Sequence, residues 1–286
     1  MNIREEIEEK GYCVVPNVLT DEEHETAYNL FHSWKNTIDN HDYIHNAVDP
    51  HGIYKHHQVG HTEHAWFIRT RPAIQNVFKD LWQTDELIVS FDGCCYIPKN
   101  CSKKDKNWTH SDQAPLTDGF QCIQGFVSLT DNKERTFVVY EGSHKIHKQY
   151  FKDLKIQNNK NWNRIPDNEI DKLSHMRKAL HVPAKSLVLW DSRTFHQNRY
   201  GKPLSEERIV QYVCYLPKSH EKNTPKMQKK RMKYFEELRT TSHWPAPIRV
   251  NALQPRTFGN ENNKIDYTNL APPNLEYLQE KIYELI

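Results

Sequence analysis

The chain has 286 residues, with 39 basic and 37 acidic side chains and a formal net charge of +2. Its mean hydropathy is −0.88, yet 11% of its residues are aromatic, which predicts a folded protein with a polar surface because disordered chains lack aromatic residues. The small net charge argues against a polyanionic partner for the whole molecule. No stretch approaches the roughly 20 apolar residues of a membrane span.

The cysteines and the first residues bear on the cellular compartment. The six cysteines show neither a Cys-x-x-Cys pair nor the spacing of a secreted scaffold. Met1 to Lys10 is acidic and amphipathic, unlike a secretory or transit signal. We therefore expect reduced thiols in a cytoplasmic protein.

Helical patterns dominate the first 85 residues. Gly11–Pro16 predicts a short strand, and Thr20 and Glu23 then form a capping box at the start of a helix. Pro72 predicts the start of a second helix. Apolar residues recur at helical spacing in both, at Ala27, Leu30, Phe31, Trp34 and Ile38 and at Ile74, Val77, Phe78, Leu81 and Trp82.

From Leu87 onward, short runs of β-branched and aromatic residues predict strands. Helical periodicity is absent until Pro225, and Gly142-Ser-His144 is interpreted as a turn. The polar stretch Asn158–Asn168 predicts a surface loop. The predicted strands are Leu87–Phe91, Phe120–Thr130, Thr136–Tyr140, Ser186–Trp190 and Ile209–Leu216, and the later helices are Thr224–Arg239 and Leu275–Leu285.

Short strands between helical flanks predict a mainly β fold with flanking helices, as in a β-sandwich or barrel. We find no internal repeat and no linker that would divide the chain. The sequence therefore predicts a single domain over residues 1–286. It comprises a helical N-terminal flank over about 1–85, a β core over about 86–217 and a helical C-terminal extension over about 218–286.

The motif His110-Ser-Asp112 is a candidate for metal binding. Side chains alternate along an extended segment, so the imidazole and the carboxylate lie on the same side. The motif alone is weak evidence, because about one His-x-Asp is expected by chance in a chain of this composition. His61-Thr-Glu63 is a competing motif of the same kind.

Two downstream residues strengthen the case for His110. His196 follows a buried-looking strand and a turn, and Arg208 opens the next strand twelve residues later. Two imidazoles and one carboxylate can occupy one face of octahedral Fe(II). An arginine can hold the far end of a dicarboxylate by two parallel hydrogen bonds; Arg193 or Arg199 could take this role in place of Arg208.

The chain resembles the phytanoyl-CoA dioxygenase-like family of Fe(II)/2-oxoglutarate-dependent oxygenases. The resemblance covers roughly the first three-quarters of the chain. It implies a double-stranded β-helix (jelly-roll, cupin-like) core, His110, Asp112 and His196 as iron ligands in the catalytic centre, Arg208 as the 2-oxoglutarate anchor, and Gln124 as a further residue of that pocket. The motifs that carry it are Gly11-Tyr-Cys-Val-Val-Pro16, His110-Ser-Asp112, Glu141-Gly-Ser-His144, His196 and Arg208.

The resemblance implies a dioxygenase that hydroxylates a small organic substrate, with Fe(II) as cofactor and 2-oxoglutarate and O2 as co-substrates. Gln197 stands where the family commonly has a glycine after the distal histidine, which argues against an acyl-CoA substrate. One alternative is a non-catalytic relative that acts as a binding or structural module. A second is a nucleic-acid binder with a basic surface.

Two further groups of residues are candidates for functional sites. His51, His56, His57, His61 and His64 fit no zinc pattern and are interpreted as a polar lid over the pocket. Lys218–Lys233 has seven basic residues and one acidic residue. We expect the five of these in the predicted helix, Lys226, Lys229, Lys230, Arg231 and Lys233, to spread around it and not to form one stripe, which argues against nucleic acid as a partner.

Overall fold

The computed structural model describes residues 2–38, 50–257, 259–268 and 270–286. The chain divides into two compact units, each described by itself. The first comprises Met1–Pro16 and Ile97–Arg208, and the second comprises Asn17–Tyr96 and Ile209–Ile286. No helix in the described ranges has the length and apolar character needed to cross a membrane.

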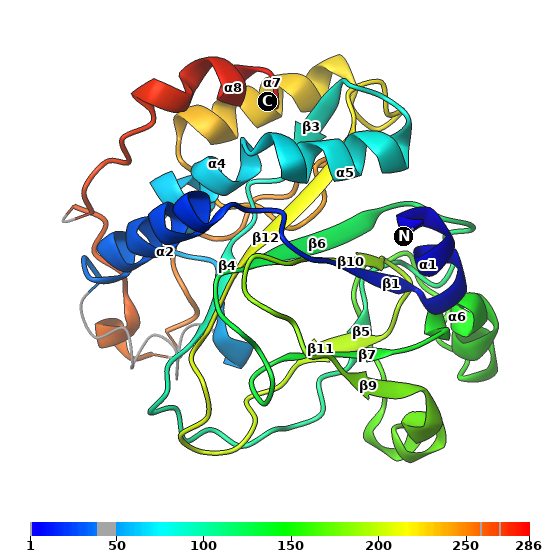
Figure 1. Cartoon of the computed structure of the whole chain (residues 1–286). Helices are drawn as coiled ribbons and strands as arrows, with labels where there is room; N and C mark the ends of the chain where they lie inside the picture. The colour runs from blue at the N-terminus through cyan, green and yellow to red at the C-terminus, as the bar shows by residue number, and fades with distance from the viewer. Residues whose placement is uncertain (1, 39–49, 258, 269) are drawn as a thin grey trace. The chain divides into compact units, whose positions relative to one another are not determined.

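The first unit contains two antiparallel groups of strands, drawn as two layers in Figure 1. One has the order β1 (Tyr12–Val15), β10 (Leu187–Asp191) and β6 (Ile123–Ser128). The other has the order β8 (Asn163–Arg164), β5 (His110–Ser111), β11 (His196–Asn198), β7 (Phe137–Tyr140) and β9 (Arg177–Ala179).

Aromatic side chains fill the space between these two layers. The ring centroids of Phe126 on β6 and Phe137 on β7 are 5.4 Å apart. Those of Trp190 on β10 and His196 on β11 are 5.3 Å apart. Two facing antiparallel sheets with flanking helices are the mainly β, jelly-roll core that the sequence predicted.

The helices of the first unit include one that the sequence prediction missed. α1 (Ile3–Lys10) precedes β1, and α6 (Ser143–Asp153) follows β7. The turn predicted at residues 142–144 is present at Gly142, which adopts φ 79°, but the prediction was wrong for Ser143 and His144, which begin α6. The buried side of α6 contains His147 as well as Phe151, so a polar residue hid the apolar stripe. Two 3₁₀ helices complete the unit, η4 (Asp167–Glu169) and η5 (Asp171–Met176).

The second unit is richer in helix. In it β12 (Arg208–Pro217) pairs with β3 (Leu87–Val89), and β2 (Ile53–Tyr54) pairs with β4 (Cys94–Ile97). Its described residues include the α-helices α2 (Asp21–Lys35), α4 (Glu63–Arg69), α5 (Pro72–Trp82), α7 (Pro225–Glu236) and α8 (Gln279–Tyr283). The 3₁₀ helices are η2 (Pro50–Gly52), η3 (Val59–His61), η6 (Glu261–Asn263) and η7 (Glu276–Leu278).

The predicted start of α2 is confirmed in atomic detail. The Glu23 amide donates to Thr20 Oγ1 at 3.1 Å, and the Thr20 amide donates to Glu23 Oε2 at 3.0 Å. The helix ends at Lys35, so Ile38 lies beyond it although it is buried. The predicted C-terminal helix is shorter than expected and forms as η7 followed by α8.

Buried arginines tie the second unit together through backbone carbonyl groups. Arg231 donates to the carbonyl oxygens of Pro245, Val89 and Leu285 at 2.8–3.0 Å. Arg69 does the same for Gly60 and Asp92. Burial lowers the pKa of Arg231 to about 9 and that of Arg69 to about 10.

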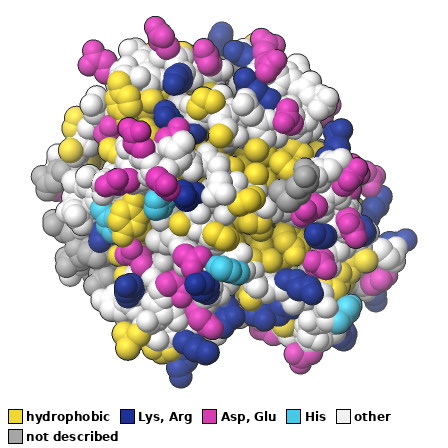
Figure 2. Space-filling view, in the orientation of Figure 1, with side chains coloured by type: hydrophobic (Ala, Val, Ile, Leu, Met, Phe, Trp, Pro, Cys, Tyr) yellow, Lys and Arg dark blue, Asp and Glu magenta, His cyan; other side chains and the backbone are white. Residues whose placement is uncertain are grey.

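The thiols and the surface agree with the composition. All six cysteines are buried, and none of them forms a disulfide bond. On the face shown in Figure 2, basic and acidic side chains are interspersed among apolar ones. That mixture matches the small net charge.

Candidate metal centre

The predicted metal ligands come from two neighbouring strands of the first unit. His110 lies on β5, and Asp112 follows directly after that strand. His196 is the first residue of β11, where it pairs across the sheet with His110. Directly opposed residues have their Cβ atoms about 4.5–5.5 Å apart. Strand pairing thus brings together residues that are 86 positions apart in the sequence.

The three side chains converge on one point. Their potential ligand atoms all lie within 4.8 Å of one another. His196 Nε2 is 3.3 Å from Asp112 Oδ2, and His110 Nε2 is 3.6 Å from Asp112 Oδ1. All three residues are buried. Among the described residues, this is the one group of histidine, cysteine and carboxylate side chains with the geometry to hold a metal ion.

Backbone carbonyl groups orient both imidazoles. His110 Nδ1 lies 3.0 Å from the carbonyl oxygen of Trp108, and His196 Nδ1 lies 2.9 Å from that of Thr194. Each Nδ1 therefore carries the proton and donates it, which leaves the Nε2 lone pair directed toward Asp112. Burial lowers the pKa of His196, and His110 lowers it further, although Asp112 opposes the shift. A neutral imidazole is the form that binds a metal.

A second layer of hydrogen bonds fixes the carboxylate side of the centre. The Asp112 amide donates to the carbonyl oxygen of Ser192 at 3.0 Å. Behind it, His147 Nε2 lies 3.1 Å from Ser111 Oγ and 3.1 Å from the Gln113 carbonyl oxygen. Burial lowers the pKa of His147 to about 4, so this support is uncharged near neutral pH. His147 was not predicted as a site residue, because it lies in a helix that the sequence pattern did not indicate.

Arg208 is a buried cation without a carboxylate partner among the described residues. Its Nη1 donates to Asn132 Oδ1 and its Nη2 to Asn198 Oδ1, both at 3.1 Å. The guanidinium also lies over the Phe126 ring, 5.1 Å from the centroid. Asn198 is two residues after His196 on β11, so both side chains project from the same face, about 6.5–7 Å apart along the strand.

The two alternative arginines are both engaged in ion pairs. Arg193 makes a two-pronged contact with Asp191, at 2.9 Å and 2.6 Å. Arg199 donates to Glu134 at 2.7 Å and lies 3.5 Å from Asp105. Their charges are therefore compensated within the protein, whereas that of Arg208 is not.

Gln124 faces the same interior as the aromatic core. It lies on β6 opposite Trp190 of β10, and Phe126 projects from the same side two residues later. Gln124 Nε2 and Trp190 Nε1 are buried and have no hydrogen-bond partner among the described residues. Buried donors are normally satisfied, so each of these two groups could donate a hydrogen bond to a bound acceptor.

The histidine-rich segment of the second unit forms no second metal centre in its described part; residues 39–49 lie outside it. His61 Nε2 contacts the Arg239 carbonyl oxygen at 3.1 Å, and its ring packs against Phe91 with centroids 4.7 Å apart. The competing motif of His61 and Glu63 therefore lacks ligand geometry. The interpretation of this segment as a polar lid stays a prediction.

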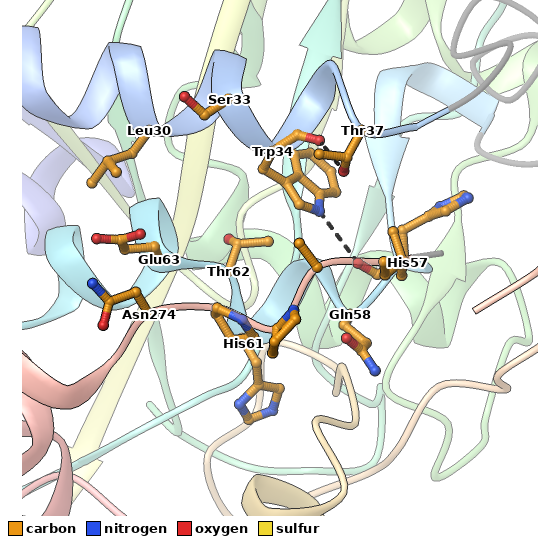
Figure 3. Close-up of a pocket in the computed structure, with 14 residues that line it drawn as sticks. Leu30, Ser33, Trp34, Thr37, His57, Gln58, His61, Thr62, Glu63 and Asn274 are labelled. Carbon is orange, nitrogen blue, oxygen red and sulfur yellow. Dashed lines mark hydrogen bonds between the residues drawn. The ribbon is translucent and has the colours of Figure 1, made fainter. Parts of the chain in front are cut away.

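The second unit also contains a cavity of about 240 Å³, shown in Figure 3. Its wall includes Trp34 of α2, whose Nε1 donates to the carbonyl oxygen of His57 at 3.3 Å. Its lining residues include His57, His61 and Glu63, which do not form a metal-binding group in the described structure. The lining residues are Leu30, Ser33, Trp34, Thr37, His57, Gln58, His61, Thr62, Glu63, Leu270, Ala271, Pro272, Pro273 and Asn274.

The expected distribution of cations around α7 was wrong. Lys226, Lys229, Lys230 and Lys233 line one shallow surface hollow, because residues three, four and seven positions apart share a helix face. Arg231 is buried on the other side and binds backbone carbonyl groups. The lysines thus form a single basic stripe of four exposed residues.

The fold and the converging side chains define the class of protein, which is a jelly roll with a two-histidine, one-carboxylate centre between its sheets. The chain belongs to the phytanoyl-CoA dioxygenase (PhyH) family, whose model matches residues 7–199. The family expected from the sequence is confirmed.

The individual proteins that the chain resembles share 30% or less of its sequence. The Ava biosynthesis cluster protein O of Aspergillus versicolor is 30% identical over 202 residues, which are 65% of this chain and 64% of that protein. Among solved structures, the non-heme monooxygenase ThoJ has a TM-score of 0.52 at 18% identity and covers 76% of this chain and 78% of its own. The epimerase SnoN, in complex with Fe3+, alpha ketoglutarate and nogalamycin RO, has a TM-score of 0.52 at 16% identity and covers 76% and 82%. These structural likenesses show the fold.

Proposed function

We propose that this protein is an Fe(II)- and 2-oxoglutarate-dependent dioxygenase that hydroxylates a small organic substrate. One observation carries the proposal. The ligand atoms of His110, Asp112 and His196 meet within 4.8 Å at a buried point. Two neutral imidazoles and one carboxylate on one face are the donor set of non-haem Fe(II) oxygenases, which leaves the other positions open.

The donor set fits the metal in its chemistry as well as its geometry. Both Nε2 atoms are free to bind because each Nδ1 donates to a backbone carbonyl group. Such outer contacts fix the ring orientation of metal-binding histidines. When bound, Fe(II) supplies the reaction with O2 that couples 2-oxoglutarate decarboxylation to oxidation of a substrate C–H bond.

Arg208 is suited to hold the distal carboxylate of 2-oxoglutarate. A buried cation is costly unless a negative charge pairs with it, and Arg208 contacts only neutral amide oxygens and an aromatic ring among the described side chains. Arg208 donates to Asn198, which is two residues after His196 on β11. A guanidinium can bind a carboxylate through two parallel hydrogen bonds.

Gln124 and Trp190 supply further donors to the same interior. Gln124 Nε2 and Trp190 Nε1 are buried without a hydrogen-bond partner, which costs free energy. A hydrogen bond from each to an oxygen atom of a bound acid would offset that cost. Phe126 and Phe137 line this region with apolar rings and exclude water from it. We assign Gln124 to the co-substrate site together with Arg208.

The comparisons support a small-molecule substrate. SnoN was solved with nogalamycin RO, and the Aspergillus versicolor relative carries the name of a biosynthesis cluster. Gln197, which departs from the family pattern, accepts hydrogen bonds from the Trp108 amide at 3.1 Å and the Thr109 hydroxyl at 2.8 Å. Gln197 therefore joins β11 to the segment before His110. This structural role explains the residue without reference to an acyl-CoA substrate.

The proposal is tested by anaerobic Fe(II) titration followed by a turnover assay. Wild-type protein should bind about one Fe(II) per chain and then release succinate from 2-oxoglutarate when O2 is admitted. A metabolite extract that raises the rate of succinate release would contain the substrate. A protein that binds no Fe(II), or binds it without consuming 2-oxoglutarate under any of these conditions, would instead be the non-catalytic relative.

A further inference from the structure

Trp162 is the most exposed of the seven tryptophans. Its exposed fraction is 51%, whereas the other six are buried or half-buried. It lies directly before β8, in which Arg164 pairs with His110 and Asn163 with Ser111. A large apolar ring therefore remains in solvent beside the strand that carries the first member of the metal centre. Leaving so much apolar area in water is unfavourable unless something covers it.

Three rings form a nearly parallel series at this point. Trp108 and His110 are stacked with centroids 4.9 Å apart and an angle of 25° between their planes. His110 and Trp162 follow at 5.5 Å and 33°. Among the described residues, His110 is the ring that Trp162 contacts, so the series ends at Trp162. Parallel and offset arrangements are favourable between aromatic rings.

The loop that carries Trp162 is held in place by asparagine side chains. Asn158 Nδ2 donates to Asn163 Oδ1 at 2.9 Å, and Asn163 Nδ2 donates to the Lys160 carbonyl oxygen at 2.6 Å. Asn161 Oδ1 accepts from the Ala114 amide at 3.1 Å, on the loop that follows Asp112. The exposed ring is thus presented from a fixed loop, which lowers the entropic cost of binding to it.

A neighbouring loop also exposes apolar side chains. Leu116 and Phe120 lie on the loop after Asp112 and are 46% and 42% exposed. The Leu116 amide donates to the Asn158 carbonyl oxygen at 3.4 Å, so this loop runs beside the one that carries Trp162. Two adjoining loops next to the metal centre therefore both expose large apolar side chains.

We propose that Trp162 is a specificity-determining residue that stacks on a planar aromatic ring of the substrate. The assignment of that ring to a substrate rests on the oxygenase function proposed above. A planar ring extends the series of Trp108, His110 and Trp162, whereas a flexible alkyl chain covers a flat indole face poorly. Trp162 contacts a part of the substrate that lies away from the carbon that reacts. It is therefore a binding residue and not a catalytic residue.

The test measures ring binding to metal-free protein by calorimetric titration. The probes are anthraquinone-2-sulfonate, which is planar and aromatic, and octanoate, which is an alkyl anion. We expect Trp162→Leu to weaken anthraquinone-2-sulfonate binding at least about fivefold, at the low end of the range for ring stacking on an aromatic side chain. Trp162→Phe keeps an aromatic face and should stay within about threefold of wild type. Octanoate binding should not distinguish the two variants.

Leu204→Ala is the matched control, because Leu204 is an 83% exposed apolar residue in a different loop, and it should bind the probe as wild type does. The proposal is overturned if wild type does not bind anthraquinone-2-sulfonate, if a folded Trp162→Leu variant binds it unchanged, or if octanoate depends on Trp162 equally. Since the protein is metal-free, these outcomes are independent of the iron and turnover results that test the oxygenase function.

Discussion

The two units contain two contrasting groups of buried histidines. In the first unit, His110 and His196 flank the Asp112 carboxylate at 3.6 Å and 3.3 Å. In the second unit, burial lowers the pKa of His57 to about 4 and that of His61 and His64 to about 3, and no carboxylate joins them in a metal-binding geometry within the described residues.

The contrast shows that a number of histidines close together in sequence does not make a metal site. His110 and His196 use Nδ1 for a backbone contact and keep Nε2 free. His61 does the reverse: its Nε2 contacts a backbone oxygen, and its Nδ1 is buried without a partner. His61 and His64 also pack against aromatic rings, such as Phe91 and Phe31. They behave as core residues with a polar edge.

The largest expected effect separates these two groups directly. His196→Ala removes one of three ligands and should reduce Fe(II) binding from about one per chain to none, with loss of all 2-oxoglutarate turnover. His110→Ala should do the same. The control is His61→Gln, which keeps a donor for the Arg239 carbonyl group and should bind iron normally. Metal content after anaerobic loading is the measurement. Iron retained by His110→Ala but lost from the His61 variant would reverse our choice of motif.

Arg208→Ala should have the next largest effect. Loss of a two-pronged guanidinium–carboxylate contact costs roughly 2–5 kcal/mol, so the concentration of 2-oxoglutarate needed for half-maximal turnover should rise at least tenfold while iron still binds. Arg199→Ala breaks the pair with Glu134 instead and should leave that concentration unchanged. If Arg208→Ala has unchanged 2-oxoglutarate affinity, the role passes to Arg193 or Arg199.

The buried histidines of the second unit should affect how the free energy of unfolding depends on pH. Their folded-state pKa values lie below the usual value near 6.5, so their contribution is complete above that pH and is lost as the pH falls through 6.5 toward 3–4. Each such residue lowers the free energy of unfolding by up to about 1.4 kcal/mol per pH unit in this window. His64→Phe should flatten the dependence measured by urea unfolding between pH 7 and about 4.5.

The control for this experiment is His175→Gln, which changes an exposed histidine of the first unit. It should preserve the slope of stability against pH. A His64→Phe variant with the wild-type slope would show that His64 titrates normally in the folded protein, and the comparison between the two groups would lose its electrostatic basis.

The smallest effect is expected at the lysine stripe of α7. The double variant Lys229→Glu and Lys230→Glu reverses its centre and should leave 2-oxoglutarate turnover nearly unchanged, because the stripe contains none of the proposed site residues. Wild-type binding to nucleic acid should be non-specific, with a Kd of roughly 10⁻⁴ M or weaker near physiological salt. Tight binding that this double variant abolishes would favour a nucleic-acid substrate.

The order of motifs along the chain predicted the candidate metal site, whereas local patterns predicted the strands but not their ends. His110, Asp112 and His196 could be named together because an alternating motif and a distant histidine follow a family order, and strand pairing brings them together. All six predicted strands exist, although the one expected over Phe120–Thr130 spans only Ile123–Ser128. Tertiary hydrogen bonding, which determines strand ends, has no local sequence signature.

The missed features have different physical causes. The two-residue strand β5 and the three-residue strand β11 are too short to show alternation, and α6 hides its buried face behind His147. The contact of His110 with Trp162 depends on pairing between β5 and β8, which joins segments more than 50 residues apart. The stripe on α7 was within reach of the sequence, since the spacing of Lys226, Lys229, Lys230 and Lys233 is helical.

The central claim is that the converging histidines and aspartate form a redox metal centre that consumes 2-oxoglutarate. The most direct test is succinate release by Fe(II)-loaded wild-type protein on admission of O2, with His196→Ala and metal-free protein in parallel. Our account predicts one succinate per CO2 from the loaded wild type and none from the other two. Equal succinate release by all three samples, or none from a wild-type protein with about one Fe(II) bound per chain, would contradict it.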